Sequence, residues 1–325
     1  MSEPLLEVSD LTVDYAAQAN VRAVDRVGVS IAAGEFLGIV GESGCGKSTL
    51  LFAIAQLLTP PAQLVSGKVV FKGSDMVHLT KGELRHARWR DFSVVMQNAM
   101  NALNPMKSIG AQLKDTLEAH ANMSRAAVRA RSSEALRMVG IDPVHLESYP
   151  HQLSGGMRQR AMIAMALLFT PQLVIMDEPT SALDVVAQKA LMRQIKDLQR
   201  QLGFAVIFVT HDMSVVSRYS DRVMVMYAGQ VAEVAATDLI FDRPLHPYTR
   251  GLLDAFPSVR GPRRSLTGIP GAPPNLTSPP SGCRFHPRCS EVMPECLHRE
   301  PDLYAIDGAE VRCLLYTQRA ERTMP

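Results

Sequence analysis

The pattern of apolar and polar residues predicts a core of short strands that alternate with helices. Phe36–Val40 is apolar throughout, which is typical of a buried strand, and Leu173–Met176 is predicted as another. Ala205–Val209 is predicted as a further strand of the sheet. Further strands are predicted at Leu6–Tyr15, Val27–Ile31, Gly67–Phe71, Phe92–Met96, Arg222–Met226 and Gln230–Val234.

Helices are predicted between these strands. One runs from Lys47 to about Leu58, and Val185–Leu202 is an amphipathic helix that Gly203 ends. Residues 108–168 are helical in pattern, and glycine and proline divide them into three or four helices. Strands that alternate with helices indicate a mostly parallel α/β core, with a helical block at about 99–168 inserted into it.

The composition is that of an ordinary globular chain, with 325 residues of which 46% are apolar and 20% charged. The net charge of +2 argues against a nucleic-acid partner. The longest apolar run, Ala161–Phe169, is too short to span a bilayer, and Met1–Pro4 does not resemble a signal peptide. We therefore expect a cytosolic chain that rests on a membrane partner.

The composition changes near Pro257, and the following stretch is rich in proline, glycine and serine. We expect a main domain over residues 1–256 and a C-terminal extension over 257–325, read as loop at its start. The extension has too few apolar residues for a core of its own and is expected to need a metal staple.

A phosphate-binding loop is predicted at Gly41–Thr49, which matches G-x-x-x-x-G-K-[ST] between a predicted strand and a predicted helix. Its backbone N–H groups would wrap the β-phosphate of a nucleotide, Lys47 would reach the β- and γ-oxygens, and the Ser48 hydroxyl would ligate Mg²⁺. Cys45 is either oxidisable, near a helix N-terminus, or a tolerated small residue. The nucleotide-binding candidates here are Gly41, Ser43, Gly44, Cys45, Gly46, Lys47, Ser48 and Thr49.

A second motif, Leu153–Arg160 (LSGGMRQR), lies between that loop and an acidic strand end. Ser154, Gly155 and Gly156 would open a helix that runs to about Phe169. A helix N-terminus presents free N–H donors and a positive dipole end, and glycines let a γ-phosphate approach the backbone closely.

The order of these segments over residues 5–245 resembles the ATP-binding cassette (ABC) family, in which LSGGxRQR is the signature motif. The resemblance implies an ABC-type P-loop NTPase with an α/β core, an antiparallel β subdomain, an inserted α-helical subdomain and a small cysteine-rich extension. It also implies that ATP and Mg²⁺ lie between two subunits, the Ser154–Gly156 face of one covering the γ-phosphate held by the other.

The same resemblance assigns roles to single residues. Asp177 would hold Mg²⁺ through water, and Glu178 would act as general base on the attacking water. Gln97 matches the glutamine that senses Mg²⁺ or water, and His211 matches the switch histidine at the γ-phosphate. Tyr15 lies where the family places a ring that stacks on adenine, although a strand-surface tyrosine is an open alternative.

Two segments point to one branch of the family. Gln97–Pro105 (QNAMNALNP) resembles the QDPMTSLNP pattern of oligopeptide and dipeptide importer ATPases, from which it departs at 98–99 and 101–102. His246–Leu253 resembles the HPYT segment of the same branch, and Met157 after Gly156 is typical of the first of its two ATPases.

This branch implies an ATPase subunit on the cytoplasmic face of the cell membrane. Its partners would be a second, different ATPase chain, two transmembrane permease subunits and an extracytoplasmic solute-binding protein, with no nucleic acid. Importers of nickel or oligosaccharides belong to the same branch, so cargo stays open. A soluble ABC ATPase of DNA repair or translation is the alternative of another class, and intact Glu178 argues against a non-enzymatic assembly role.

Four cysteines in the extension form the pattern C-x5-C-x6-C-x16-C: Cys283, Cys289, Cys296 and Cys313. They resemble a C-terminal motif that in some peptide-importer ATPases ligates a [4Fe–4S] cluster. Four thiolates can also bind zinc, but structural zinc usually has cysteines two to four residues apart, so we favour iron–sulfur. His286 or His298 could replace a cysteine, and four unligated thiols are the remaining alternative.

Overall fold

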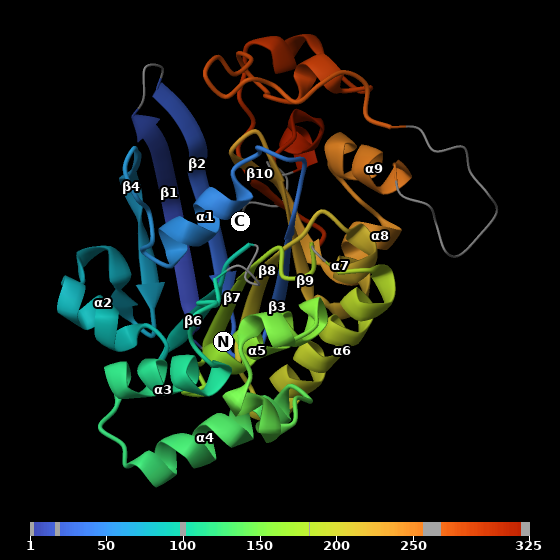
Figure 1. Ribbon diagram of the computed structural model, residues 1–325. Coiled ribbons are helices and arrows are strands. Elements are labelled where there is room, and N and C mark those ends of the chain that lie inside the picture. Colours follow the sequence, from blue (N-terminus) through green and yellow to red (C-terminus); the bar gives the residue numbers. More distant parts are fainter. Residues whose placement is uncertain (1–2, 17–19, 98–101, 182, 256–267, 320–325) are drawn as a thin grey trace. The chain divides into compact units, whose positions relative to one another are not determined.

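The computed structural model describes residues 3–16, 20–97, 102–181, 183–255 and 268–319. Its described residues form two compact units. Figure 1 labels their helices and strands. The first is built mainly from residues 31–36 and 78–209, and the second from 4–30, 37–77 and 210–325. No helix in the described part of the chain is both long and apolar enough to cross a membrane.

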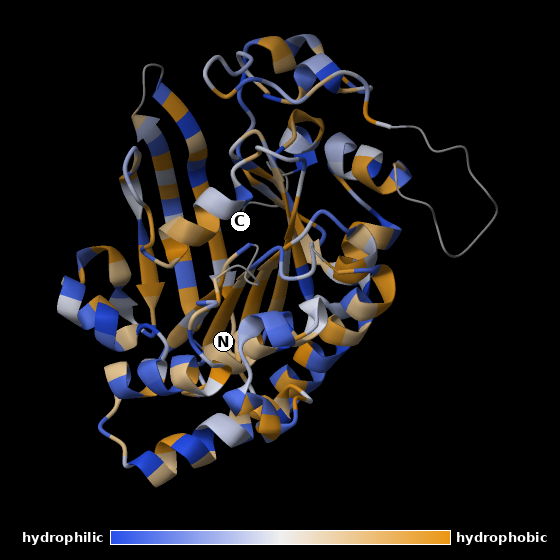
Figure 2. Cartoon of the chain, in the orientation of Figure 1, coloured by the Kyte–Doolittle hydropathy of each residue, from blue (hydrophilic) through white to orange (hydrophobic). Residues whose placement is uncertain are grey.

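The first unit contains three parallel strands, in the order β8 (Ala205–Val209), β7 (Leu173–Asp177) and β6 (Phe92–Val95). Every residue of β7 and β8 is buried, as expected for parallel strands covered on both faces. Figure 2 shows β7 and β8 mostly in orange, the colour of hydrophobic residues. The amphipathic helix α6 (Val185–Leu202) has the bounds that the sequence predicts and ends at Gly203, whose backbone is left-handed.

The helical block contains α3 (Ile109–His120), α4 (Arg125–Met138) and α5 (Gly155–Ala166), with 3₁₀ turns at Pro143–Glu147 and Pro150–Gln152. Each α-helix begins after a serine whose hydroxyl accepts a backbone N–H: Ser108, Ser124 and Ser154. The prediction of three or four helices is confirmed, although α5 ends at Ala166 rather than near Phe169. The unit also contains α2 (Lys81–Ala87).

The second unit contains a four-stranded sheet in the order β2 (Asn20–Ile31), β1 (Leu6–Ala16), β4 (Ala62–Phe71) and β5 (Ser74–Asp75). Strands β1 and β4 are antiparallel, with Leu6 opposite Phe71. This confirms the expected antiparallel β subdomain. Strand β4 begins at Ala62, ahead of the expected Gly67, and its first residues pair with β1, where Ala62 lies opposite Tyr15.

A second set of strands in this unit has the order β11 (Tyr304–Ile306), β12 (Ala309–Val311), β10 (Gln230–Ala236), β9 (Arg222–Tyr227) and β3 (Phe36–Val40). Strands β3 and β9 are parallel, and the pairs from β9 to β11 are antiparallel. The C-terminal extension thus supplies the edge strand β11 and, next to it, β12, neither of which its sequence predicted.

The described residues of the second unit also form the α-helices α1 (Lys47–Ile54), α7 (Met213–Tyr219), α8 (Thr237–Asp242) and α9 (Pro247–Asp254). Helix α1 is shorter than predicted, because it stops at Ile54 rather than near Leu58. The backbone of Gln56 is left-handed, with φ 53°, and a left-handed residue ends a helix.

Candidate functional site

The phosphate loop connects β3 to α1 in the second unit, as its sequence predicts. Gly41 and Gly46 have positive φ values of 151° and 102°. A Cβ at Gly46 would lie 2.1 Å from the carbonyl oxygen of Ala23, and one at Gly41 would lie 2.2 Å from that of Met226. Only glycine fits this close backbone approach, so the motif glycines set the path of the loop.

Lys47 is buried at the start of α1 and points back into the loop. Its Nζ donates to the carbonyl oxygens of Gly41 at 2.8 Å and Glu42 at 2.9 Å. Cys45 is also buried, and burial raises the pKa of its thiol, with Lys47 partly opposing the shift. The thiol is therefore protonated at neutral pH, which fits a tolerated small residue rather than a reactive one.

Tyr15 stands near the end of β1, and its hydroxyl lies 3.1 Å from the hydroxyl of Thr49 in α1. This contact fixes the tyrosine beside the helix that follows the phosphate loop. Ser43 and Gly44 are exposed on the loop, and Ser48 is half-buried.

The candidate catalytic carboxylate lies at the end of β7 in the first unit. Asp177 is the last residue of the strand and is buried. Glu178 follows in a left-handed conformation, φ 45°, and its N–H donates to the carbonyl of Val209 at 3.1 Å. Gln97, which follows β6, donates from Nε2 to the Glu178 carboxylate at 3.1 Å. The structure therefore brings together two residues that the sequence assigned separately.

The signature segment opens α5 in the first unit. Ser154 is the N-cap, and its hydroxyl accepts the N–H of Met157 at 3.3 Å, while Gly155 and Gly156 form the first turn. A Cβ at Gly156 would meet nothing within 4 Å, so this turn presents an open backbone surface. The helix start predicted from the motif is confirmed.

Gln159 contributes a contact that sequence reasoning missed. Its side chain is buried and donates to the carbonyl oxygen of Pro179 at 2.6 Å, which ties α5 to the segment after Glu178. Its place inside the signature motif is the only signal that could have drawn attention to it. Ala182, within the segment after Glu178, lies outside the described residues, as do positions 98–101 of the segment that follows Gln97.

His211 lies in the second unit, exposed, in the turn between β8 and α7. Asp212 caps α7 by accepting the N–H of Ser214 at 2.8 Å, and the Asp212 N–H donates to the Thr210 hydroxyl at 3.1 Å. The turn that carries the histidine is thus held on both sides.

The HPYT segment reaches the phosphate loop, which its sequence did not indicate. His246 caps α9 by accepting the Tyr248 N–H on Nδ1 at 2.9 Å. The fully buried Tyr248 accepts the N–H of Glu42 on its hydroxyl at 2.9 Å. Burial raises the pKa of Tyr248 far above its ordinary value, so its hydroxyl stays protonated.

The four cysteines of the extension gather in the second unit. The Cys283 N–H donates to the Cys296 carbonyl at 2.9 Å, and Cys296 and Cys313 are buried. Burial raises the pKa of Cys283 to about 11 and that of Cys313 to about 12, and the neighbouring thiols add to both shifts. Yet among the described residues no three His, Cys, Asp or Glu side chains are arranged to hold a metal ion. The donor set fits a cluster or zinc, whereas this arrangement of the side chains does not.

Two family models match the chain. Residues 24–181 match the ABC transporter family, and residues 232–296 match the C-terminal region of the oligopeptide/dipeptide transporter family. A solved structure, the ATP-binding cassette MJ0796 as a post-hydrolysis dimer bound to ADP and Pi, is 29% identical with a TM-score of 0.64. It covers 71% of this chain and 98% of its own.

Curated relatives match along nearly the whole length. The dipeptide transport ATP-binding protein DppD of Caldanaerobacter subterraneus is 42% identical, over 97% of this chain and 98% of the relative. DppD of Bacillus subtilis is 43% identical, over 99% of this chain and 98% of the relative. The oligopeptide transport ATP-binding protein OppD of Bacillus subtilis is 42% identical, over 93% and 86%. Taken with the phosphate loop, the Gln97–Glu178 pair and the signature helix, these matches show that the chain belongs to the ATP-binding subunits of the oligopeptide and dipeptide ABC transporters.

Proposed function

We propose that this chain is the ATP-hydrolysing subunit of a membrane importer for peptides. The carrying observation is the Gln97–Glu178 contact, which places a polar amide on the carboxylate that would accept a proton from the attacking water. The relatives named for dipeptide and oligopeptide transport, similar over almost their full lengths, support peptides as the cargo. They favour this cargo over nickel or oligosaccharides, and favour transport over DNA repair or translation.

ATP and Mg²⁺ are held by the residues of the sequence motifs in this proposal. The amides of the phosphate loop and Lys47 hold the phosphates, while Ser48, Gln97 and Asp177 serve Mg²⁺, which neutralises charge that develops on the transferred group. Glu178 orients and deprotonates water. The remaining roles belong to His211 at the γ-phosphate and Tyr15 at adenine.

The signature turn Ser154–Gly156 acts on a nucleotide held by a second ATPase subunit, which we take to be a different chain. ATP closes the two subunits and hydrolysis reopens them, so the helical block moves two transmembrane permease subunits at the cytoplasmic face of the membrane. A solute-binding protein outside delivers the peptide. A purified monomer that hydrolysed ATP at the full rate of the assembled transporter would contradict this scheme.

Glu178→Gln in the assembled transporter tests the catalytic assignment. The amide cannot take the proton, so kcat should fall by a factor of about 100 or more, the lower end of what a general base usually contributes, while ATP still binds. Asp197→Asn is the matched control, because Asp197 is an exposed carboxylate on α6 that pairs with Arg193 at 3.9 Å. Unchanged ATPase activity of the Glu178 variant would refute the role.

For the four cysteines we propose metal ligation, with a [4Fe–4S] cluster favoured over zinc. The four-cysteine pattern and the chemistry of thiolates support this, whereas the described arrangement of the side chains does not. A bound cation would favour the thiolate form that burial otherwise opposes. Anaerobic purification followed by iron, sulfide and zinc analysis tests it. Zinc without iron would exclude the cluster. If neither metal were found, the four thiols would be free.

A further inference from the structure

The loop between Cys283 and Cys289 carries an arginine that forms an ion pair with the phosphate loop. Arg288 donates from Nη1 to one oxygen of Glu42 at 2.7 Å and from Nη2 to the other at 2.9 Å. The two side chains are 6% and 25% exposed. This two-pronged contact between a planar guanidinium and a carboxylate is charge-assisted, directional and largely shielded from water.

Arg288 is held in place from its other side. Its Nε donates to the carbonyl oxygen of Pro270 at 2.8 Å, and its guanidinium lies 5.8 Å from the ring centre of Tyr227. An arginine that is fixed by its own neighbours loses little freedom in holding Glu42. Arg288 is therefore the fixed partner, and the contact sets the position of Glu42 in the phosphate loop.

Glu42 is the residue of the phosphate loop through which the ion pair with Arg288 would affect nucleotide binding. Its N–H donates to the Tyr248 hydroxyl at 2.9 Å, and its carbonyl accepts from Lys47 Nζ at 2.9 Å. Side chain, N–H and carbonyl of this one residue are all engaged. A rotation of Glu42 would move the lysine and reorient the adjacent backbone amides.

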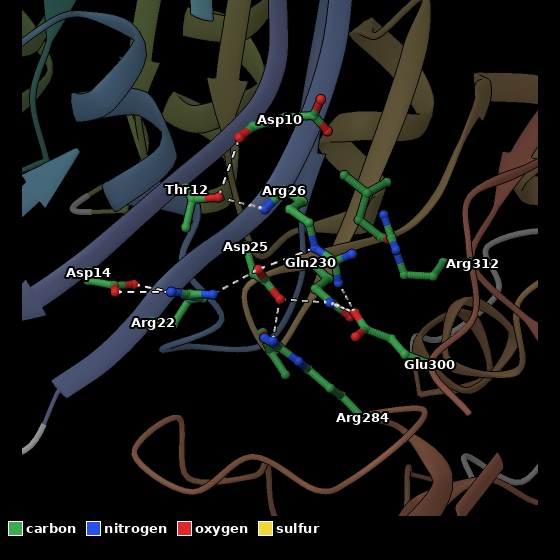
Figure 3. A network of polar contacts seen from close by, with 12 residues as sticks. Asp10, Thr12, Asp14, Arg22, Asp25, Arg26, Gln230, Arg284, Glu300 and Arg312 are labelled. Carbon is green, nitrogen blue, oxygen red and sulfur yellow. Dashed lines mark hydrogen bonds and ion pairs between the residues drawn. The ribbon is translucent and has the colours of Figure 1, made fainter. Parts of the chain in front are cut away.

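A second arginine of the same loop, Arg284, contacts residues beside the phosphate loop. Arg284 donates to the carbonyl of Ala228. It also donates to the buried carboxylate of Asp25, as Figure 3 shows. The next residue, Gly229, donates its N–H to the carbonyl oxygen of Cys45 at 2.9 Å. Arg288 thus contacts the phosphate loop directly through Glu42, whereas Arg284 contacts the neighbouring Ala228, which precedes the glycine that bonds to Cys45.

We propose that Arg288 is a positioning residue for nucleotide binding, which acts through Glu42, and that the cysteine-bearing extension is therefore a working part of the nucleotide site. The extension then sets the affinity for ATP rather than the chemical step. This inference rests on the proposed function, because it assumes that Gly41–Thr49 binds ATP.

The test compares Arg288→Gln, Glu42→Gln and the double variant, each in the Glu178→Gln background so that binding of ATP is measured without turnover. Each single change should weaken ATP binding roughly tenfold, equivalent to about 1.4 kcal/mol. The double variant should bind no worse than the weaker single, because both changes break one contact. Arg288→Lys, which keeps the charge but lacks the fork, should fall between wild type and Arg288→Gln.

Glu291→Gln is the matched control, since it removes an exposed ion pair between the extension and Arg250 that does not reach the phosphate loop. It should leave ATP binding unchanged. With Glu178 restored, the assembled transporter carrying Arg288→Gln should show a raised KM for ATP and a kcat at saturation within about twofold of wild type, as expected for lost uniform binding.

ATP binding by Arg288→Gln equal to wild type, or losses that multiply in the double variant, would overturn the proposal. Should Arg288→Gln fail to fold, Glu42→Gln alone decides, because it leaves the extension intact. Failure of the proposed function has a different signature: Glu178→Gln would keep turning over ATP, whatever Arg288 does to binding.

Discussion

Gln97 donates a hydrogen bond of 3.1 Å to Glu178, a residue 81 positions later in the chain. The pairing of β6 with β7 explains the contact, because Val95 lies opposite Met176 and both strands run in parallel. Parallel neighbours end at the same edge of a sheet, so the residues that follow them meet there. Glu178 and its amide neighbour Gln97 are therefore positioned by the sheet register.

Replacement of Gln97 by alanine should lower kcat about 10- to 100-fold, since the Glu178 carboxylate loses a donor that orients it. Nucleotide affinity should change by less than about threefold, as the phosphate loop is untouched. Gln201→Ala, an exposed change on α6, is the control. Steady-state ATPase assays on the assembled transporter check the first effect and equilibrium ATP binding the second. A purely raised KM would assign Gln97 to binding instead.

Two glycines of the phosphate loop should respond differently to alanine. At Gly46 the new Cβ would lie 2.1 Å from the Ala23 carbonyl oxygen, whereas at Gly44 it would meet nothing within 4 Å. Both have positive φ, so both variants carry a strain of about 1 kcal/mol. The Cβ of Gly46→Ala must also displace the backbone of Ala23. This variant should therefore bind ATP about 100-fold more weakly than Gly44→Ala, a difference equivalent to roughly 2.7 kcal/mol.

Equilibrium ATP binding, with urea unfolding alongside, separates the two variants. Equal affinities for Gly44→Ala and Gly46→Ala would show that the loop relaxes away from Ala23. In that case the close approach would not be what holds the loop.

The parts of this fold that follow local rules could be predicted from sequence. The phosphate loop, the serine-capped start of α5 and the full extent of α6 depend on glycine geometry, capping and periodicity within one segment. The contact of Arg288 with Glu42 joins residues 246 positions apart, and no local pattern encodes it. The same holds for β12, a short strand whose pairing with β10 depends on the tertiary fold.

His246 should make the chain less stable in mild acid. It is buried, and burial lowers its pKa from 6.5 to about 3. The unfolded state takes up a proton as the pH falls below 6.5, whereas the folded state does not until about pH 3, so stability is lost across this window. At pH 5.0 the loss relative to pH 7.5 should be roughly 2 kcal/mol.

His246→Asn tests this, because asparagine retains a side-chain acceptor for the N-cap of α9 and removes the titration. The variant will be less stable at pH 7.5, but the difference in its free energy of unfolding between pH 7.5 and pH 5.0 should shrink by that amount. Buried Glu233 has the opposite sign: burial raises its pKa, so its contribution is lost as the pH rises through its folded value. Urea unfolding at both pH values measures the difference, and an unchanged difference would mean that His246 does not cause it.

Arg131 should stabilise the signature helix from its far end. It donates from Nε to the carbonyl of Leu168 at 2.6 Å and from Nη2 to that of Leu167 at 2.9 Å, just after the end of α5. Carbonyls at a helix C-terminus lack helical partners and carry the negative end of the dipole, which a cation satisfies. Arg131→Met should therefore cost about 1–2 kcal/mol of unfolding free energy.

Arg129→Met is the control. The Arg129 side chain is 74% exposed and pairs with Glu147 at 3.6 Å, so its loss should cost less than about 0.5 kcal/mol. Denaturant unfolding of both variants decides, and equal costs would mean that the two carbonyls gain nothing from Arg131 that water does not supply.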